Sequence, residues 1–138
     1  MSVLGIRFYG DLILARRTRP VQLPGEREVL AALVRDLFET MEANGGVGLA
    51  ANQAGSPLRV AVISIPPKEG PGVRLVLVNP ELVCGEGSQT GEEGCLSFPG
   101  LFLRIKRFEK VKVRSYNERG LPVELNADGF LARALQHE

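Results

Sequence analysis

The first segment that could carry chemistry is a run of small residues that ends in a glutamine. Residues 46–53 read GVGLAANQ. Glycine and alanine let another backbone approach closely, and the side-chain amide of Gln53 offers two hydrogen-bond donors. The local pattern alone favours a helix cap followed by a tightly packed loop over a ligand site. A phosphate-binding loop is disfavoured because no lysine follows the glycines.

The second segment places a cysteine between glycines. Residues 92–100 read EEGCLSFPG, so Cys95 lies in a predicted loop and not within an apolar run. A cysteine in this setting can be a nucleophile, a metal ligand or a free packed thiol, and the segment alone does not choose among them. The other cysteine, Cys84, follows Leu82 and Val83, which is typical of a structural cysteine in apolar surroundings.

The third segment is the pair His137-Glu138. His-Glu on a helix is the first half of the pattern H-E-x-x-H, in which two histidines bind a metal and the glutamate acts as general base. The second histidine of that pattern would fall at position 141. Taken alone, a histidine at such a place is more typical of the positive charge often found at the end of a helix.

Two helices and several strands are expected to position these segments. Apolar residues recur at helical spacing over residues 26–44, and the glycines that follow end this helix. Residues 85–100 show little periodicity and are predicted to be irregular. Asp128 can cap a last helix, whose apolar stripe consists of Phe130, Leu131, Ala134 and Leu135. Strands are predicted at 58–65, at 73–78 with a continuation at 82–84 after a break at Asn79-Pro80, at 108–116, and at 121–125 after a turn.

This order of elements does not alternate as parallel βαβ units do. We therefore predict an α+β fold of mixed, mostly antiparallel strands around a central C-terminal helix, with one N-terminal amphipathic helix. The 138 residues suffice for one domain, and their content of 44% apolar and 24% charged residues is that of a globular chain rather than a disordered one.

Charge and hydropathy limit the expected partners and location. The formal net charge is +1, which argues against general binding to nucleic acid. No run approaches the ~18 consecutive apolar residues of a membrane-spanning helix, and the N-terminus lacks the apolar run of a signal peptide. Two cysteines make no disulfide framework. We therefore expect a cytoplasmic protein in a reducing compartment, with neither a nucleic acid nor a membrane as partner.

Taken in order, the three segments resemble the three motifs of the peptide deformylase family. The first motif is close to G-Φ-G-Φ-A-A-x-Q, which residues 46–53 match throughout, and the second is E-G-C-L-S, which residues 93–97 match at every position. The third is H-E-x-D-H at the end of a long helix, of which His137 and Glu138 are present. The resemblance extends over the whole chain, so we expect residues 1–138 to form a single deformylase-like domain that is incomplete at its C-terminal end.

The resemblance implies a metal-dependent hydrolase that removes the formyl group from the N-terminal formyl-methionine of new proteins and releases formate. Cys95 and His137 would bind one divalent metal, typically Fe²⁺, for which Zn²⁺, Ni²⁺ or Co²⁺ can substitute. A histidine on the next helical turn would be the third ligand. One thiolate and two imidazoles suit a four-coordinate site with water in the open position. Metal binding lowers the pKa of this water, so hydroxide becomes available to attack the formyl carbon.

The resemblance also assigns catalytic and substrate-binding roles. Glu138 would take the proton of the attacking water and deliver it to the leaving amine. The side-chain amide of Gln53, the backbone N–H of Leu96 and the metal would hold the oxyanion. Gly48 would let the substrate backbone lie along the first segment. The apolar slot for the methionine side chain would be lined by Val47, Phe130, Ala134 and the aliphatic stem of Arg133.

Two other functions remain open at this point. A non-catalytic relative would recognise formyl-methionyl or other peptide N-termini without releasing formate. A thiol enzyme would use Cys95 with His137 and need no metal, but it would leave Glu138 and Gln53 without a role. Because the family acts on nascent chains, the expected partners are N-formylmethionyl peptides and, near its exit, the ribosome.

Overall fold

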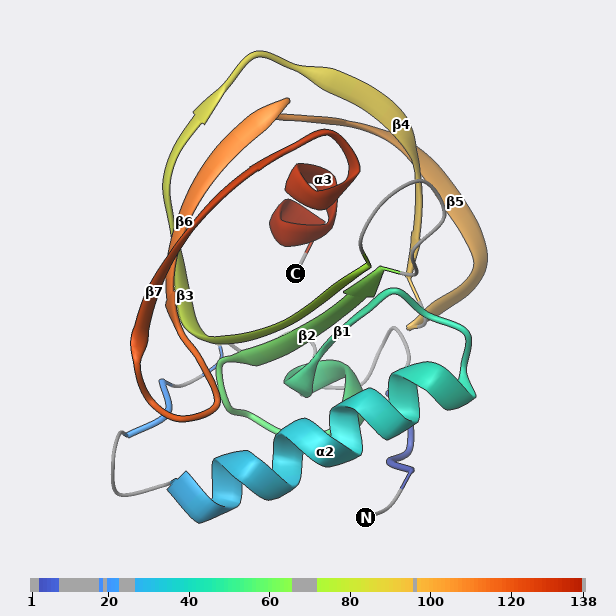
Figure 1. Cartoon of the computed structure of the whole chain (residues 1–138). Coiled ribbons are helices and arrows are strands. Elements are labelled where there is room, and N and C mark those ends of the chain that lie inside the picture. The colour runs from blue at the N-terminus through green and yellow to red at the C-terminus, as the bar shows by residue number, and fades with distance from the viewer. Residues whose placement is uncertain are drawn as a thin grey trace.

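The computed structural model describes residues 3–7, 18, 20–22, 27–65, 72–95 and 97–137. A five-stranded sheet in the order β1-β2-β3-β6-β7 and a two-stranded sheet of β4 and β5 enclose α3, while α2 lies across the outer face of the larger sheet (Figure 1). Neighbouring strands in the described sheets are antiparallel, which confirms the predicted α+β class. The elements are α2 (Arg27–Ala43), β1 (Gly48–Ala50), the 3-10 helix η1 (Ala51–Ala54), β2 (Val60–Ile65), β3 (Val73–Glu86), β4 (Gln89–Cys95), β5 (Phe98–Arg107), β6 (Lys110–Tyr116), β7 (Pro122–Asp128) and α3 (Gly129–His137).

Helix α2 buries one apolar stripe against the sheet, as its sequence predicts. Leu37 follows Leu30 by seven positions and Met41 follows Leu37 by four, and all three are 0% exposed. After the helix, Gly45 has a φ of +69°, a left-handed conformation that glycine adopts without strain. The N–H of Gly46 then donates to the Met41 carbonyl at 3.0 Å, which closes the last turn and directs the chain into β1.

Replacing Leu37 with alanine should lower the free energy of unfolding by about 2–5 kcal/mol, because the substitution removes buried contacts and leaves a cavity. Urea unfolding of the purified protein measures this change. Val29→Ala is the matched control on the same helix, since Val29 is 55% exposed and its loss should cost far less. Equal effects of the two substitutions would contradict the packing described here.

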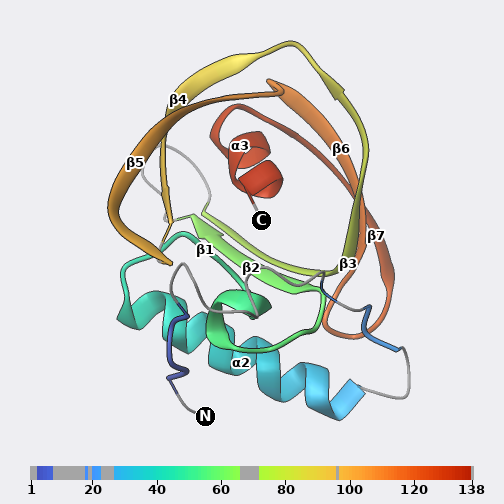
Figure 2. The ribbon, with the colours of Figure 1, turned by 180° about the vertical axis from the view of Figure 1, so that it is seen from behind.

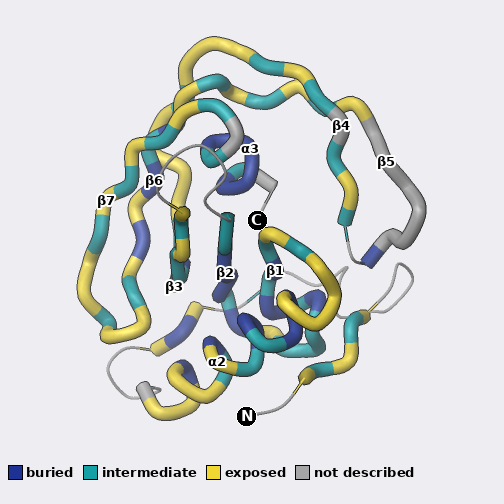
Figure 3. The backbone as a smooth tube through the Cα atoms, turned by 45° about the vertical axis from the view of Figure 1, so that its right-hand side comes forward, coloured by how far each residue is buried: buried dark blue, intermediate teal, exposed yellow. Residues whose placement is uncertain are grey.

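Strand β2 is buried on both sides because a helix covers each face of the larger sheet. Val60 and Val62 belong to the apolar cluster beneath α2, whereas Ala61 and Ile63 belong to the cluster around α3. Successive side chains of a strand point to opposite faces, so a continuous apolar run serves both clusters. In Figure 3 the two helices lie on either side of β2, and their buried parts face it.

Strand β3 continues through Asn79 and Pro80, where the sequence predicts a break. Asn79 has a φ of +52°, and the pairing of β3 with β6 shifts between Val78 and Glu81. The Asn79 side chain accepts the Val21 N–H at 2.7 Å and donates to the Val21 carbonyl at 3.0 Å. A bulge stabilised by these two bonds absorbs the proline, which has no N–H for the ladder.

The prediction that residues 85–100 are irregular is wrong. Gln89–Cys95 forms β4, which pairs with β5 in the sheet that arches over α3 (Figure 2). The sequence QTGEEGC of β4 has two glycines and no apolar alternation, so it carries no strand signal of its own. Cys95 is therefore the last residue of a strand, not a loop residue.

Cys84 also differs from its prediction. It is exposed, and its neighbours Leu82 and Val83 are 53% and 43% exposed. This end of β3 extends beyond the two apolar clusters that the described residues form, so an apolar run here does not mean burial.

Helix α3 is buried nearly all round. Ala132, Ala134 and Leu135 are 0%, 8% and 7% exposed, and Arg133 between them is 7% exposed. The predicted stripe is thus part of a wider buried surface, and the side chain of Phe130 lies outside the described residues. Within the described part of the chain, no helix has the length and apolar character needed to cross a bilayer.

Candidate active site

Gln53 is held by the short turn to which it belongs. Its side chain is buried, and its Oε1 accepts the Ala50 N–H at 2.9 Å. This bond fixes the orientation of the amide, because the oxygen is used within the turn and the NH₂ group faces away. Nε2 then donates to Cys95 Sγ at 3.0 Å and to Ser97 Oγ at 3.5 Å. The first and second motifs, 42 residues apart, therefore meet at one amide group.

Cys95 lies at an irregularity at the end of β4. The register with β5 shifts between Gly94 and Cys95, which pairs with Phe98. Such bulges re-aim a side chain at the end of a strand. The thiol is half-buried and forms no disulfide. An N–H donor at 3.0 Å suits a thiolate, since an ionised acceptor makes the stronger hydrogen bond.

His137 is the last residue of α3, and the C-terminal end of this helix lies inside the enclosure formed by the two sheets (Figures 1 and 2). Gln136 anchors this last turn: its Nε2 donates to the Phe108 carbonyl and its Oε1 accepts the Phe108 N–H, both at 2.8 Å. The His137 side chain and the whole of Leu96 and Glu138 lie outside the described residues.

One member of the predicted metal-ligand set can be compared with the structure. Among the described side chains, no three of His, Cys, Asp or Glu form a group that could hold a metal ion. The cysteine member of the predicted set is described, however: the Cys95 sulfur is oriented by Gln53 and lies outside any disulfide. Thiolate and imidazole together suit Fe²⁺ or Zn²⁺.

The residues predicted to contact substrate lie on β1 and α3. Gly48 begins β1, and Val47 precedes it with 40% of its surface exposed. Ala134 is 8% exposed on α3. The Arg133 guanidinium is engaged with Glu93, so its aliphatic stem is the part that remains for an apolar slot.

Sequence reasoning missed two parts of this region. Ser97, which is 2% exposed, lies beside the Gln53 amide, although it stands in the second motif without a predicted role. Glu93, in the same motif, is buried between Arg107 and Arg133. The position of Glu93, two residues before Cys95, is the sequence signal that could have drawn attention to this carboxylate. Its two arginine partners lie on β5 and α3, and no sequence spacing reveals them.

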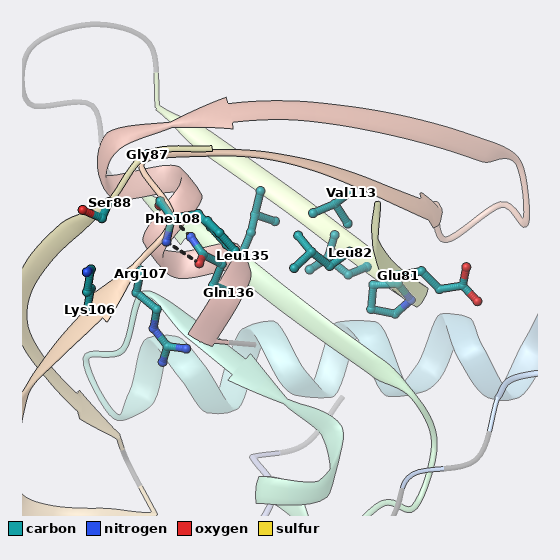
Figure 4. A pocket seen from close by; sticks show the side chains of 12 residues that line it. Glu81, Leu82, Gly87, Ser88, Lys106, Arg107, Phe108, Val113, Leu135 and Gln136 are labelled. Atoms are coloured by element: carbon teal, nitrogen blue, oxygen red, sulfur yellow. Dashed lines mark hydrogen bonds between the residues drawn. The ribbon is translucent and has the colours of Figure 1, made fainter. Parts of the chain in front are cut away.

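A pocket of about 600 Å³ lies elsewhere on the molecule (Figure 4). Its lining includes Leu82, Val113, Phe108, Leu135 and Gln136, and none of the predicted site residues whose side chains the structure describes. The candidate active site is therefore the region of Gln53 and Cys95 and not this pocket.

An α+β fold that places a cysteine sulfur under an amide donor, with a buried helix that extends to His137, is the arrangement predicted for one class of protein: hydrolases that use a cysteine-ligated metal. Comparison with known proteins then specifies the member of this class. The model of the family described as "Polypeptide deformylase" matches residues 3–138.

Relatives and solved structures agree with this match. The chain is 51% identical over 137 residues to the peptide deformylase of Aquifex aeolicus, covering 99% of this chain and 80% of that protein. It is similar to a class I type b peptide deformylase structure from Acinetobacter baumannii, with a TM-score of 0.93, 34% identity and coverage of 100% and 92% of the two chains. The Legionella pneumophila structure gives a TM-score of 0.89 at 40% identity, covering 98% of this chain and 78% of the other. The chain belongs to the polypeptide deformylase family, which is metal-dependent.

Proposed function

We propose that this protein hydrolyses the N-formyl group of formyl-methionyl peptides and releases formate. The observation that carries the proposal is the hydrogen bond of 3.0 Å between Gln53 Nε2 and Cys95 Sγ. It places an oriented amide donor, which can hold an oxyanion, beside the predicted metal ligand.

Cys95 and His137 would hold one divalent metal, for which we propose Fe²⁺, with Zn²⁺, Ni²⁺ or Co²⁺ able to substitute. Such a metal lowers the pKa of water and polarises a carbonyl oxygen. Gln53 orients the sulfur through its Nε2, and Gln136 anchors the turn of α3 that carries His137. The two proposed ligands, Cys95 at the end of β4 and His137 at the end of α3, are thus supported by different hydrogen bonds.

The other residues of the chain would manage the proton and the developing negative charge. Glu138 would accept a proton from the attacking water and transfer it to the leaving amine. The Gln53 Nε2 and the Leu96 N–H would donate to the oxyanion. Because the Gln53 Oε1 is bound to the Ala50 N–H, the amide plane would stay in place, and the longer of the two Nε2 contacts, to Ser97 Oγ at 3.5 Å, would yield to the oxyanion.

The substrate backbone would lie along β1. This strand is the first of the described five-stranded sheet and pairs with β2 on one side, so a peptide could add to its other edge beside Gly48. The slot for the methionine side chain would be formed by Val47, Phe130, Ala134 and the stem of Arg133. We further propose that the protein works in the cytoplasm on nascent chains near the ribosome exit.

Formate release from a short formyl-Met peptide tests this proposal. Metal-free protein, prepared with a chelator, should be inactive, and Fe²⁺ added without oxygen should restore release. Alkylation of the metal-free protein with iodoacetamide should prevent this restoration. The assay uses a Cys84→Ser background, because Cys84 is exposed and would otherwise react as well.

The alternatives give different results in this assay. Release that needs no metal and is blocked by alkylation would identify a thiol enzyme. Binding of the peptide without formate release, with metal supplied, would identify a recognition protein. Either result would overturn the proposal.

A further inference from the structure

Glu93 is a buried carboxylate held between two arginines. Its side chain is 6% exposed. Arg107 of β5 donates to it through Nη2 at 2.8 Å and Nε at 3.2 Å, and Arg133 of α3 donates through Nη1 at 2.5 Å. The Arg133 side chain is 9% exposed and that of Arg107 is 24% exposed, so the contact with the helix is the more deeply buried of the two.

The Arg133 guanidinium also contacts the backbone of both strands of the small sheet. Its Nη1 lies 3.3 Å from the Gly91 carbonyl of β4 and 3.3 Å from the Ile105 carbonyl of β5. A Cβ at Gly91 would lie 3.1 Å from Arg133 Nη2, closer than ordinary van der Waals contact. The small sheet therefore leaves space for this guanidinium and binds it.

The spacing of this ion pair relates it to the two predicted metal ligands. Glu93 precedes Cys95 by two residues at the end of β4, just before the register shift between Gly94 and Cys95. Arg133 precedes His137 by four residues on α3, the spacing of neighbours on one helix face. The ion pair thus joins β4, two residues before one predicted ligand, to α3, about one helical turn before the other.

The two predicted ligands belong to different parts of the fold. Helix α3 packs against β6 and β7 of the five-stranded sheet, whereas Cys95 ends a strand of the two-stranded sheet. A metal site needs its ligands within about 0.5 Å of their working positions. A bond between α3 and β4, close to both ligands, is suited to set that separation.

We propose that the ion pair between Glu93 and Arg133 is a positioning clamp that sets the separation of Cys95 and His137 and thereby the affinity for the metal. This inference rests on the proposed function, because it takes these two residues as ligands. Buried ion pairs contribute little net stability compared with apolar pairs of similar size. The clamp should therefore affect metal binding more than folding.

Arg133→Met and Arg107→Met form a matched pair of variants, since each removes one arginine from the same carboxylate. Of the two arginines, Arg133 lies on α3 and Arg107 on β5. The first readout is affinity for Co²⁺, measured by the absorption of the thiolate–cobalt complex. Arg133→Met should weaken it by about 10–100-fold, the range seen when residues that support metal ligands are removed. Arg107→Met should leave the affinity close to that of the wild type.

Two further measurements separate positioning from folding. The double variant Glu93→Leu/Arg133→Met replaces the pair by apolar groups and should unfold, without metal, close to the wild-type urea midpoint, yet bind Co²⁺ as weakly as Arg133→Met. Formate release at saturating metal should show a fall in kcat larger than any rise in KM, and Arg133→Lys should recover part of the affinity.

The outcomes distinguish this inference from the proposed function. If the wild type forms no thiolate–cobalt complex and releases no formate, the proposed function fails. If the wild type does both and Arg133→Met binds Co²⁺ normally, or if Arg107→Met weakens binding equally, only the clamp is wrong. Should Arg133→Met not fold, the double variant decides, because normal affinity in that protein overturns the clamp.

Discussion

Replacing Glu138 with glutamine should lower kcat for formate release by about 10²–10⁴-fold, the contribution typical of a general acid–base catalyst. Glutamine keeps the size and the hydrogen-bonding capacity of the side chain, but it cannot take a proton from water or deliver one to the leaving amine. The metal content should stay unchanged, because the proposed ligands are Cys95 and His137. A steady-state assay with a formyl-Met peptide and elemental analysis of the purified variant measure the two quantities.

Glu124→Gln is the matched control for this substitution. Glu124 forms an ion pair with Lys112 at 3.3 Å across β6 and β7, and its side chain is 50% exposed. Exposed pairs of this kind contribute little to stability, so the control should keep wild-type kcat. Retention of activity in Glu138→Gln, with metal content verified, would show that another group carries the proton.

Replacing Gln53 with glutamate should lower kcat by about 10²–10³-fold with a smaller change in KM. The variant keeps an oxygen that can accept the Ala50 N–H, so the turn is preserved. It loses the NH₂ group that would donate to the oxyanion and brings a negative charge close to Cys95 Sγ, which is 3.0 Å from the wild-type Nε2. Both changes oppose the negative charge that develops on the formyl oxygen.

The control for added charge is Asn126→Asp, the same amide-to-carboxylate change on an exposed residue of β7. It should retain wild-type kcat and KM. Gln53→Met provides a second comparison, because it removes the donor without adding charge. If Gln53→Met also keeps wild-type kcat, the amide of Gln53 is not an oxyanion donor.

The candidate site could be predicted largely because its residues lie in short runs of sequence. Residues 46–53 and 93–97 match their family motifs, and the structure brings Gln53 to Cys95. The partners of Glu93 could not be predicted in this way. Arg107 and Arg133 reach it from 14 and 40 residues away, and only the folded arrangement of α3 against the small sheet reveals the contact.

The fold could be predicted where a segment's own pattern decides its structure. Helix α2 has an apolar stripe and a glycine cap, and β6 alternates between buried and solvent-facing residues. Strand β4 has neither signal. Its conformation is determined by its pairing with β5 and by its place beside α3. The prediction that Cys84 lies in apolar surroundings is wrong for a related reason. An apolar run indicates burial only where another element covers it. This end of β3 extends past both apolar clusters of the described chain.

The enclosure of α3 between two sheets has a consequence for the order of folding during synthesis. The seven described strands all leave the ribosome before α3, so the apolar surface that this helix fills stays open until the last of the described elements arrives. That surface includes Ala61, Ile63, Leu77, Val111 and Val113. An intermediate with this surface exposed is prone to aggregate, which favours rapid docking of the helix. Because the same helix carries His137, docking completes the core and brings the second proposed ligand into the enclosure in a single event.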